Sequence, residues 1–271
     1  MNLKPFMVKP DSKVKLSDFE TDGKKLYDGN KKDGVEELKH LRAEIDRMQE
    51  ILYAQNKHRL LIVFQAMDTA GKDGVTRSVF EGVNPQGVKV VSFKAPTVTE
   101  LDHDYLWRVH ARVPARGEIV VFNRSHYEDV LVVRVHELVD KKVWKRRYRH
   151  INEFERMLTD EGVTLVKCFL HIDLDTQKER LLDRINVPEK QWKFNPGDIE
   201  ERKFWPAYMQ AYEDMLNETS TEWAPWHVIP SNHNWLRNLT VASIITGALK
   251  GLNLEYPQPV EQIEQYREKL V

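Results

Sequence analysis

The residues with the clearest chemical meaning follow an apolar run at 60–66, where the chain continues Met-Asp-Thr-Ala-Gly-Lys-Asp-Gly. A strand, a glycine-lysine turn and a helix in this order form a loop whose backbone N–H groups and helix dipole bind phosphate. Lys72 would add a positive charge for the phosphate oxygens. Two positions depart from the common pattern G-x-x-x-x-G-K-[ST], because Ala66 replaces the first glycine and Asp73 replaces Ser or Thr. The alternative is a plain strand-to-helix turn whose lysine faces water. We favour phosphate binding, with contacts expected from Thr69, Ala70, Gly71, Asp73 and Gly74.

A second polar segment, residues 123–129, follows another apolar run and reads Asn-Arg-Ser-His-Tyr-Glu-Asp. The carboxyl ends of parallel strands meet at one edge of a sheet, so this segment and the glycine-lysine turn should face the same crevice. Asp68 and Asp129 carry the oxygen ligands that Mg²⁺ prefers, and Arg124 can bind two phosphate oxygens at once. The alternative roles for these two carboxylates are a helix cap and a solvated helix face. We predict a magnesium-assisted phosphoryl-transfer site.

Two basic segments lie further along the chain. The first, about 184–203, is rich in Pro and Gly and contains Arg184, Lys190, Lys193, Arg202 and Lys203. It resembles the lid of a small kinase, which closes over phosphates and excludes water, although an ordinary surface helix-loop-helix would have the same composition. The second, residues 141–149, places its apolar residues on one helical stripe, which predicts a mostly solvated basic face. A groove for an extended polyanion is the sharper alternative.

The histidines lack the spacing of a metal site, and no nucleophile elbow is present. His126 next to Arg124 suggests a phosphohistidine, but we expect it to order the loop through hydrogen bonds. Ser125 has no base placed by spacing. The sequence therefore gives little support for covalent catalysis.

Alternating strands and helices should position these residues on a parallel sheet covered on both faces. The expected strands are the apolar runs 60–66, 88–93, 118–123, 165–172 and 226–230. The expected helices are 35–56, 72–82, 99–111, 126–138, 141–160, 175–187, 198–218 and 234–251. Thr99 with Asp102 and Asp198 with Glu201 are expected to act as capping boxes.

Composition predicts a globular intracellular protein. Hydrophobic residues make up 41% of the chain, the formal net charge is −1, and the one cysteine, Cys168, lies in an apolar run typical of a buried strand in a reducing cytosol. No apolar stretch approaches the roughly 20 residues that span a bilayer, and the amino terminus lacks a signal-peptide pattern. Residues 1–34 have no sustained period, so we expect either an arm draped on the domain or a disordered segment. Residues 35–271 form the expected single domain.

Five segments together resemble the family 2 polyphosphate kinases. They are Ala-Met-Asp-Thr-Ala-Gly-Lys-Asp-Gly (66–74), Asn-Pro-Gln-Gly-Val (84–88), Phe-Asn-Arg-Ser-His-Tyr-Glu-Asp-Val-Leu-Val (122–132), Trp-Lys-Phe (192–194) and Ala-Pro-Trp (224–226). The resemblance runs from about residue 35 onward. The segment Arg-Ser-His-Tyr-Glu-Asp-Val further resembles the subgroup, often called class III, that accepts both AMP and ADP.

The resemblance implies an α/β, three-layer P-loop kinase fold, thymidylate-kinase-like, with a central parallel five-stranded sheet and a helical lid. It implies direct transfer of the terminal phosphate of inorganic polyphosphate to AMP or ADP, with Mg²⁺ and without a phosphoenzyme. It also implies a homo-oligomer, with helix 35–56 either a subunit contact or a core helix. The residues that match family positions are Asp68 and Lys72 in the modified loop, Arg124 after the third strand, Asp129 as a metal-holding acid, Arg184 and Lys193 in the lid, and Glu128 where subgroups differ. Asn123 departs from the acid that many P-loop kinases carry at this strand end.

The physics of the substrates is consistent with this resemblance. Polyphosphate carries about one negative charge per phosphate, so a nearly neutral chain must concentrate its Lys and Arg locally. Adenine needs only an apolar slot with a few polar groups. From topology we expect that slot just past the second strand, at Phe93, Lys94, Pro96 and Thr97.

Two alternatives remain open at this point. The first is an ATP-dependent nucleotide or nucleoside kinase on the same fold, which the unusual Asp68 and Asp73 and the basic lid disfavour. The second is a non-enzymatic P-loop module that binds nucleotide, or RNA through residues 141–149; the near-neutral charge disfavours nucleic acid. The sequence leaves open the adenine-versus-guanine preference, the favoured direction of transfer, the chain length and the oligomer size.

Overall fold

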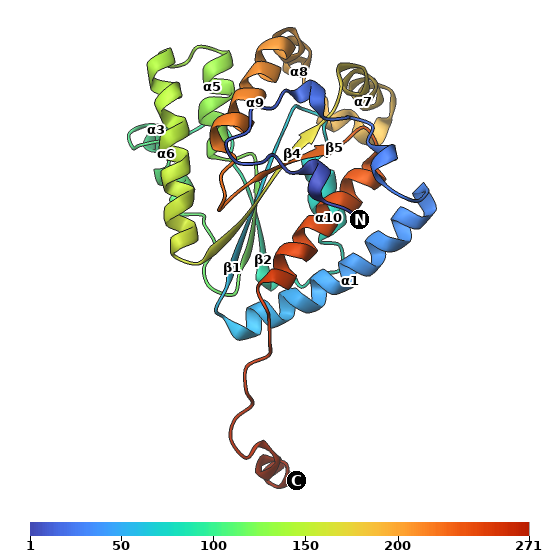
Figure 1. Ribbon diagram of the computed structural model, residues 1–271, viewed down its shortest axis with the longest axis vertical. Coiled ribbons are helices and arrows are strands. Elements are labelled where there is room, and N and C mark those ends of the chain that lie inside the picture. The colour runs from blue at the N-terminus through green and yellow to red at the C-terminus, as the bar shows by residue number, and fades with distance from the viewer. Residues whose placement is uncertain (271) are drawn as a thin grey trace.

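A five-stranded parallel sheet forms the centre of the computed structural model, which describes residues 1–270 (Figure 1). The strand order is β2-β3-β1-β4-β5. The predicted three-layer α/β fold is confirmed, and each strand lies within two residues of its expected bounds. These are β1 Arg59–Ala66, β2 Val88–Ser92, β3 Ile119–Asn123, β4 Val163–His171 and β5 Trp226–Pro230.

Helices cover both faces of the sheet, because the central strands are apolar on both sides. Every residue of β3 is buried, and so is every residue of β1 after Arg59. One face packs against α1 (Lys31–Gln55), α2 (Lys72–Val79) and α10 (Asn234–Gly251). The other face packs against α6 (Lys141–Asp160) and α9 (Trp205–Thr219) (Figure 1). The remaining α-helices are α3 Val98–Leu101, α4 Trp107–His110, α5 Val132–Val135, α7 Leu174–Asn186 and α8 Pro196–Glu201.

Three long helices expected from the sequence are wrong as continuous elements. Residues 99–111 form the short α3 and α4, and residues 126–138 form the 3₁₀ turn His126–Val130 followed by α5. Residues 198–218 divide between α8 and α9, with a 3₁₀ turn between them. Pro206 in the first turn of α9 lacks an N–H, so a helix begins there more readily than it continues.

The helix caps also differ from the expected ones. Asn30 caps α1 by accepting from the backbone N–H groups of Lys32 and Asp33, so this helix begins four residues earlier than its apolar stripe indicated. The capping box on α3 joins Thr97 to Glu100, and the side chain of Asn195 caps α8. Both expected capping boxes, at Thr99 and Asp198, are therefore wrong.

The amino-terminal residues lie against the domain. Phe6 and Val8 are each 1% exposed, and the backbone N–H of Val8 donates to the carbonyl of Trp226 at 2.8 Å. The arm therefore packs beside the edge strand β5. The boundary expected at residue 34 falls inside α1, and the division into arm and domain remains a prediction, with residue 271 outside the described part. At the other end, the tail after α10 extends away from the body (Figure 1). Within residues 1–270, we find no helix with both the length and the apolarity to cross a bilayer.

Candidate active site

The glycine-lysine turn connects β1 to α2 and is shaped by one close contact. Gly71 has φ +102°, and a Cβ atom there would lie 2.0 Å from Nη1 of Arg237. Only glycine satisfies both the backbone angle and the approach of the guanidinium. Thr69 is also in the left-handed region, at φ +66°, and its buried Oγ1 has no hydrogen-bond partner among the described residues. A strained loop with an unsatisfied polar atom is typical of a ligand-binding site.

Lys72 is the first residue of α2, and its Nζ donates to the carbonyl of Ala66 at 2.8 Å. Burial lowers the pKa of Lys72, and the nearby carboxylate of Asp68 partly opposes that shift. An ammonium group that has lost part of its hydration interacts more strongly with an anion than one in bulk water. The expected phosphate-binding lysine therefore lies where the motif predicted.

Arg124 reaches the same loop from the end of β3. Its Nη2 pairs with Oδ1 of Asp68 at 2.9 Å, across 56 residues of sequence. Burial alone would lower the pKa of Arg124, but Glu128 and Asp68 outweigh it and raise the pKa. Arg124 has φ +63°, a conformation rare for a residue with a Cβ atom. The structure thus joins the two segments that the sequence placed in one crevice.

Two arginines that sequence reasoning missed bind carbonyl groups of the loop. Arg180 of α7 donates to the carbonyl of Thr69 at 2.9 Å, and Arg237 of α10 donates to the carbonyl of Ala70 at 3.0 Å. Burial and the neighbouring Arg180 lower the pKa of Arg237 to about 9. Neither arginine forms a salt bridge with a carboxylate in the described part of the chain. They leave positive charge uncompensated beside the loop, and no motif around either residue could have indicated it.

The expected lid, about 184–203, contains the end of α7, the 3₁₀ turn Pro188–Lys193, α8 and the 3₁₀ turn Arg202–Phe204. Arg184 pairs with Asp198 at 2.7 Å and also donates to the carbonyl of Lys193 at 3.3 Å. These contacts join the two arms of the helical segment across its turn. Of the five basic residues expected there, Arg184, Lys190 and Lys193 line the cavity above the loop. The other two point elsewhere, since Arg202 binds Gln177 and Lys203 pairs with Glu200.

The cavity between loop and lid has a volume of about 710 Å³ and a strong excess of positive charge. Eight cationic side chains line it: Lys72, Lys94, Arg124, Arg180, Arg184, Lys190, Lys193 and Arg237. Four acidic side chains line it: Asp68, Asp73, Asp183 and Asp198. Low-dielectric walls focus the field of such a cluster, so this cavity suits a polyanion although the whole chain carries a net charge of −1.

The segment expected to hold the adenine only partly reaches this cavity. Phe93 and Lys94 line it, whereas Pro96 and Thr97 are outside the described lining and Thr97 caps α3. Phe93 is 7% exposed and packs edge-on against Phe122, with ring centroids 4.9 Å apart. Its ring is therefore mainly part of the core, and Lys94 is the member of this segment best placed to contact a ligand.

Asp129 does not join Asp68, contrary to the expected metal pair. Its carboxylate accepts from Arg147 of α6 at 3.0 Å, and it lines neither described cavity that contains Asp68. Burial raises the pKa of Asp129 to about 6, against the opposing effect of Arg147. The neighbouring Glu128 instead lines a second cavity of about 290 Å³ together with Asp68 and Arg124. Asp129 and Glu128 face different surroundings because they are adjacent in the 3₁₀ turn His126–Val130, where neighbouring side chains point to different sides.

The side chains near the loop supply only some of the ligands that a divalent metal ion needs. Among residues 1–270, no group of three or more His, Cys, Asp or Glu side chains is arranged to bind an ion. Asp68 uses one carboxylate oxygen for Arg124, and Glu128 lines the smaller cavity beside it. The other two acids of that cavity, Asp198 and Glu201, already pair with Arg184 and His136. Mg²⁺ commonly binds through one or two carboxylates plus substrate phosphates, so this donor set fits an ion that is held jointly with a phosphorylated substrate.

The basic segment 141–149 is a helix face, as its apolar stripe predicted. Trp144, Tyr148 and Ile151 are buried, whereas the side chain of Arg149 is 73% exposed. Arg147 is the exception because it pairs with Asp129. No residue of this segment lines the 710 Å³ cavity, so the segment and the cavity are separate features of the described chain.

On a parallel sheet, a basic cavity above a phosphate-binding loop and under a helical lid is the arrangement of a P-loop kinase. Comparison with known families agrees and is more specific. Residues 28–257 match the family described as Polyphosphate kinase 2 (PPK2). The chain belongs to this family of kinases.

Several relatives match the chain over nearly its full length. The AMP/ADP-polyphosphate phosphotransferase of Meiothermus ruber is 53% identical, over 99% of both chains. The ADP-polyphosphate phosphotransferase of Rhodopseudomonas palustris is 43% identical, over 99% of this chain and 98% of that one. Among solved structures, Polyphosphate Kinase 2 from Arthrobacter aurescens TC1 superposes with a TM-score of 0.94 at 42% identity, covering 98% of this chain and 94% of that chain.

Proposed function

We propose that this kinase transfers the terminal phosphoryl group of inorganic polyphosphate directly to AMP or ADP. The observation that carries this proposal is the cavity above the phosphate-binding loop, where eight cationic side chains face four acidic ones. A single nucleotide triphosphate does not need so many cations, whereas a polyphosphate chain carries about one negative charge at every phosphate. The names of the full-length relatives support the same donor and acceptors.

In this proposal, Lys72 and Arg124 hold the phosphoryl group during transfer. Both are charged donors close to the loop, and Asp68 orients Arg124 through their 2.9 Å pair. Positioning and charge stabilisation supply most of the catalysis in phosphoryl transfer. Direct transfer needs no nucleophilic side chain, and both candidates nearby, Ser125 and His126, are buried and bonded to other residues.

We propose Mg²⁺ as the divalent ion, bound by Asp68 together with phosphate oxygens and with Glu128 as the neighbouring acid. The ion would offset the charge on the phosphoryl oxygens. Burial raises the pKa of Glu128 although Arg124 and Lys72 oppose the shift, so an added positive charge would favour its ionised form. Asp129 is left out of this proposal because Arg147 already holds its carboxylate.

For the acceptor we propose two contact regions that an experiment can separate. Phe93 and Lys94 line the larger cavity, and Pro96 and Thr97 follow them in the chain. Glu128 lines the smaller cavity, which shares Asp68 and Arg124 with the larger one. Lys94→Ala should raise the KM for AMP if the nucleotide enters beside β2, and Glu128→Gln should do so if it enters through the smaller cavity. An unchanged KM in either variant removes that region from the acceptor site.

The deciding experiment incubates the purified protein with long-chain polyphosphate, Mg²⁺ and either AMP or ADP, and then separates the nucleotides. We expect ADP and ATP to form, and the same assay with ATP as donor to AMP to be far slower. Guanine nucleotides in parallel tubes would give the base preference. Faster transfer from ATP than from polyphosphate would make the chain an ATP-dependent kinase and refute the proposal.

We also infer a cytoplasmic homo-oligomer that does not bind nucleic acid. The one cysteine, Cys168, is buried in β4, as expected in a reducing compartment. Val98, Leu101 and Trp107 are 78%, 67% and 45% exposed, which is unusual for large apolar residues on one short segment. Light scattering at several concentrations would test the assembly, and a monomer throughout would exclude it.

A further inference from the structure

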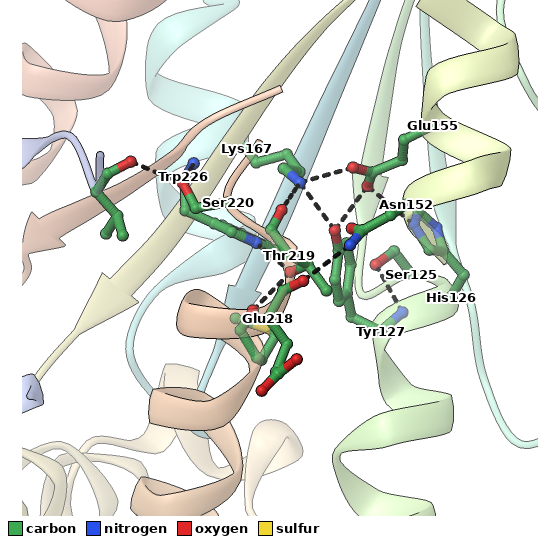
Figure 2. Close-up of polar contacts among 12 residues, drawn as sticks. Ser125, His126, Tyr127, Asn152, Glu155, Lys167, Glu218, Thr219, Ser220 and Trp226 are labelled. Carbon is green, nitrogen blue, oxygen red and sulfur yellow. Dashed lines mark hydrogen bonds and ion pairs between the residues drawn. The ribbon is translucent and has the colours of Figure 1, made fainter. Parts of the chain in front are cut away.

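A lysine lies fully buried in the middle of the central sheet. Lys167 of β4 is 0% exposed, and its Nζ donates to Oε2 of Glu155 at 2.6 Å, to the hydroxyl of Tyr127 at 2.9 Å and to the carbonyl of Thr219 at 2.7 Å (Figure 2). All three ammonium hydrogens therefore have acceptors. A buried ion pair of this kind is seldom a net source of stability, because desolvation offsets the attraction between the charges. Its presence calls for another explanation.

Glu155 of α6 connects this lysine to the segment that follows β3. Its Oε1 accepts from the hydroxyl of Tyr127 at 2.7 Å and lies 3.2 Å from Nε2 of His126 (Figure 2). Burial alone would raise the pKa of Glu155, but Lys167 and His126 outweigh it and lower the pKa, so the carboxylate is charged. A charged acceptor binds both partners more strongly than a neutral one would. His126 orders the loop through hydrogen bonds, as the sequence suggested.

The same segment also contacts β1, the strand that precedes the phosphate-binding loop. The amide of Gln65 satisfies both of its neighbours when its oxygen accepts from Oγ of Ser125 at 3.0 Å and its nitrogen donates to Oε1 of Glu128 at 3.1 Å. Ser125 Oγ also accepts from the backbone N–H of Tyr127 at 3.2 Å. Residues 125–128 are thus held through side chains of β1, β4 and α6.

The residue just before this fixed segment is strained. Arg124 has φ +63°, and its backbone N–H donates to the carbonyl of Phe64 at 3.3 Å. A non-glycine residue keeps such a conformation only where the surrounding contacts determine it on both sides. The bond to Phe64 of β1 fixes the backbone of Arg124 itself. The bonds of Glu155 to His126 and Tyr127 fix the residues that follow Arg124.

We propose that Lys167 and Glu155 are positioning residues that act through His126 and Tyr127 to hold Arg124 and Glu128 in place for phosphoryl transfer. The inference rests on the proposed function, since it assigns Arg124 to the transferred group. Glu155 belongs to α6, which packs on one face of the sheet. It lines neither the 710 Å³ cavity nor the 290 Å³ cavity, the two that contain Arg124, so it acts on the reaction through the loop.

The test uses Glu155→Gln, which keeps the size of the side chain and removes its charge. We expect kcat for transfer from polyphosphate to AMP to fall at least tenfold, with each KM changed less than threefold. The matched control is Glu153→Gln on the same helix, where the side chain is 65% exposed and pairs with Arg149. It should keep both parameters within twofold of the unchanged protein.

A second variant keeps the test decisive if Glu155→Gln folds poorly. Tyr127→Phe removes one hydroxyl and leaves the Lys167–Glu155 pair intact, and we expect kcat to fall about threefold to tenfold. In an Arg124→Ala background, either substitution should lower kcat by a smaller factor than in the unchanged protein, because one of the two residues that the network positions is gone. An undiminished effect in that background would show that the network acts elsewhere.

The outcomes separate the two proposals. If the unchanged protein transfers phosphate and folded Glu155→Gln has the same kcat, the buried pair is only structural and the positioning role is wrong. If the unchanged protein shows no transfer from polyphosphate, the proposed function fails and the positioning role fails with it.

Discussion

Replacing Gly71 by alanine should damage the phosphate-binding loop through two separable effects. The first is the backbone angle of φ +102°, where a Cβ atom costs about 1–2 kcal/mol. The second is the 2.0 Å approach of that atom to Nη1 of Arg237, which must move. Arg237 would then lose its bonds to the carbonyl of Ala70 at 3.0 Å and to Oδ1 of Asn234 at 2.9 Å.

The size of the second effect follows from the burial of Arg237, which is 3% exposed. A hydrogen bond to a charged group contributes about 1.5–3 kcal/mol, and the displaced guanidinium has little access to water. With two such bonds lost, both effects together should lower the free energy of unfolding by about 4–8 kcal/mol. The loop carbonyls would shift as well, so kcat/KM for polyphosphate should fall about tenfold or more.

Gly82 offers a matched control within the same chain. Its φ is +88°, and a Cβ atom there meets nothing within 4 Å. Gly82→Ala should therefore show the backbone effect alone, about 1–2 kcal/mol, with unchanged activity. Urea unfolding and steady-state kinetics of both variants give the comparison. Equal losses of stability in the two variants would refute the argument that Arg237 closes over Gly71.

Three further predictions concern Lys72, the two aspartates and a buried histidine. Lys72→Ala should lower kcat about 100-fold or more and leave the unfolding midpoint nearly unchanged, because its charge acts on phosphate; normal turnover would contradict the site. Asp68→Asn should raise the Mg²⁺ concentration needed for half-maximal rate about tenfold, whereas Asp129→Asn should change it less than twofold. A larger effect of Asp129→Asn than of Asp68→Asn would show that Asp129 binds the metal, as the sequence predicted. Burial lowers the pKa of His171 from 6.5 to about 4, so the unfolded chain binds a proton in this range that the folded chain does not. Stability should therefore fall by up to about 3 kcal/mol between pH 6.5 and pH 4, and His171→Asn should lose this slope in urea titrations. Parallel pH profiles of the two proteins would show that His171 is not the cause.

The sequence by itself determined the features that depend on neighbours along the chain. Apolar runs located all five strands, and the order of strand, turn and helix located the phosphate-binding loop with Lys72 at the start of α2. The bounds expected for α6 and α10 agree with the structure. These features are local, because backbone periodicity and turn chemistry act over a few residues.

The tertiary structure alone decided which side chains meet. Arg180 and Arg237 contact the loop across 111 and 167 residues of sequence. Lys167, within an apolar strand, forms an ion pair with Glu155 of α6. Glu128 and Asp129 are adjacent in sequence, yet one faces the site and the other faces α6. Direction within a short turn depends on backbone angles that distant contacts impose, and a local pattern carries no information about those contacts.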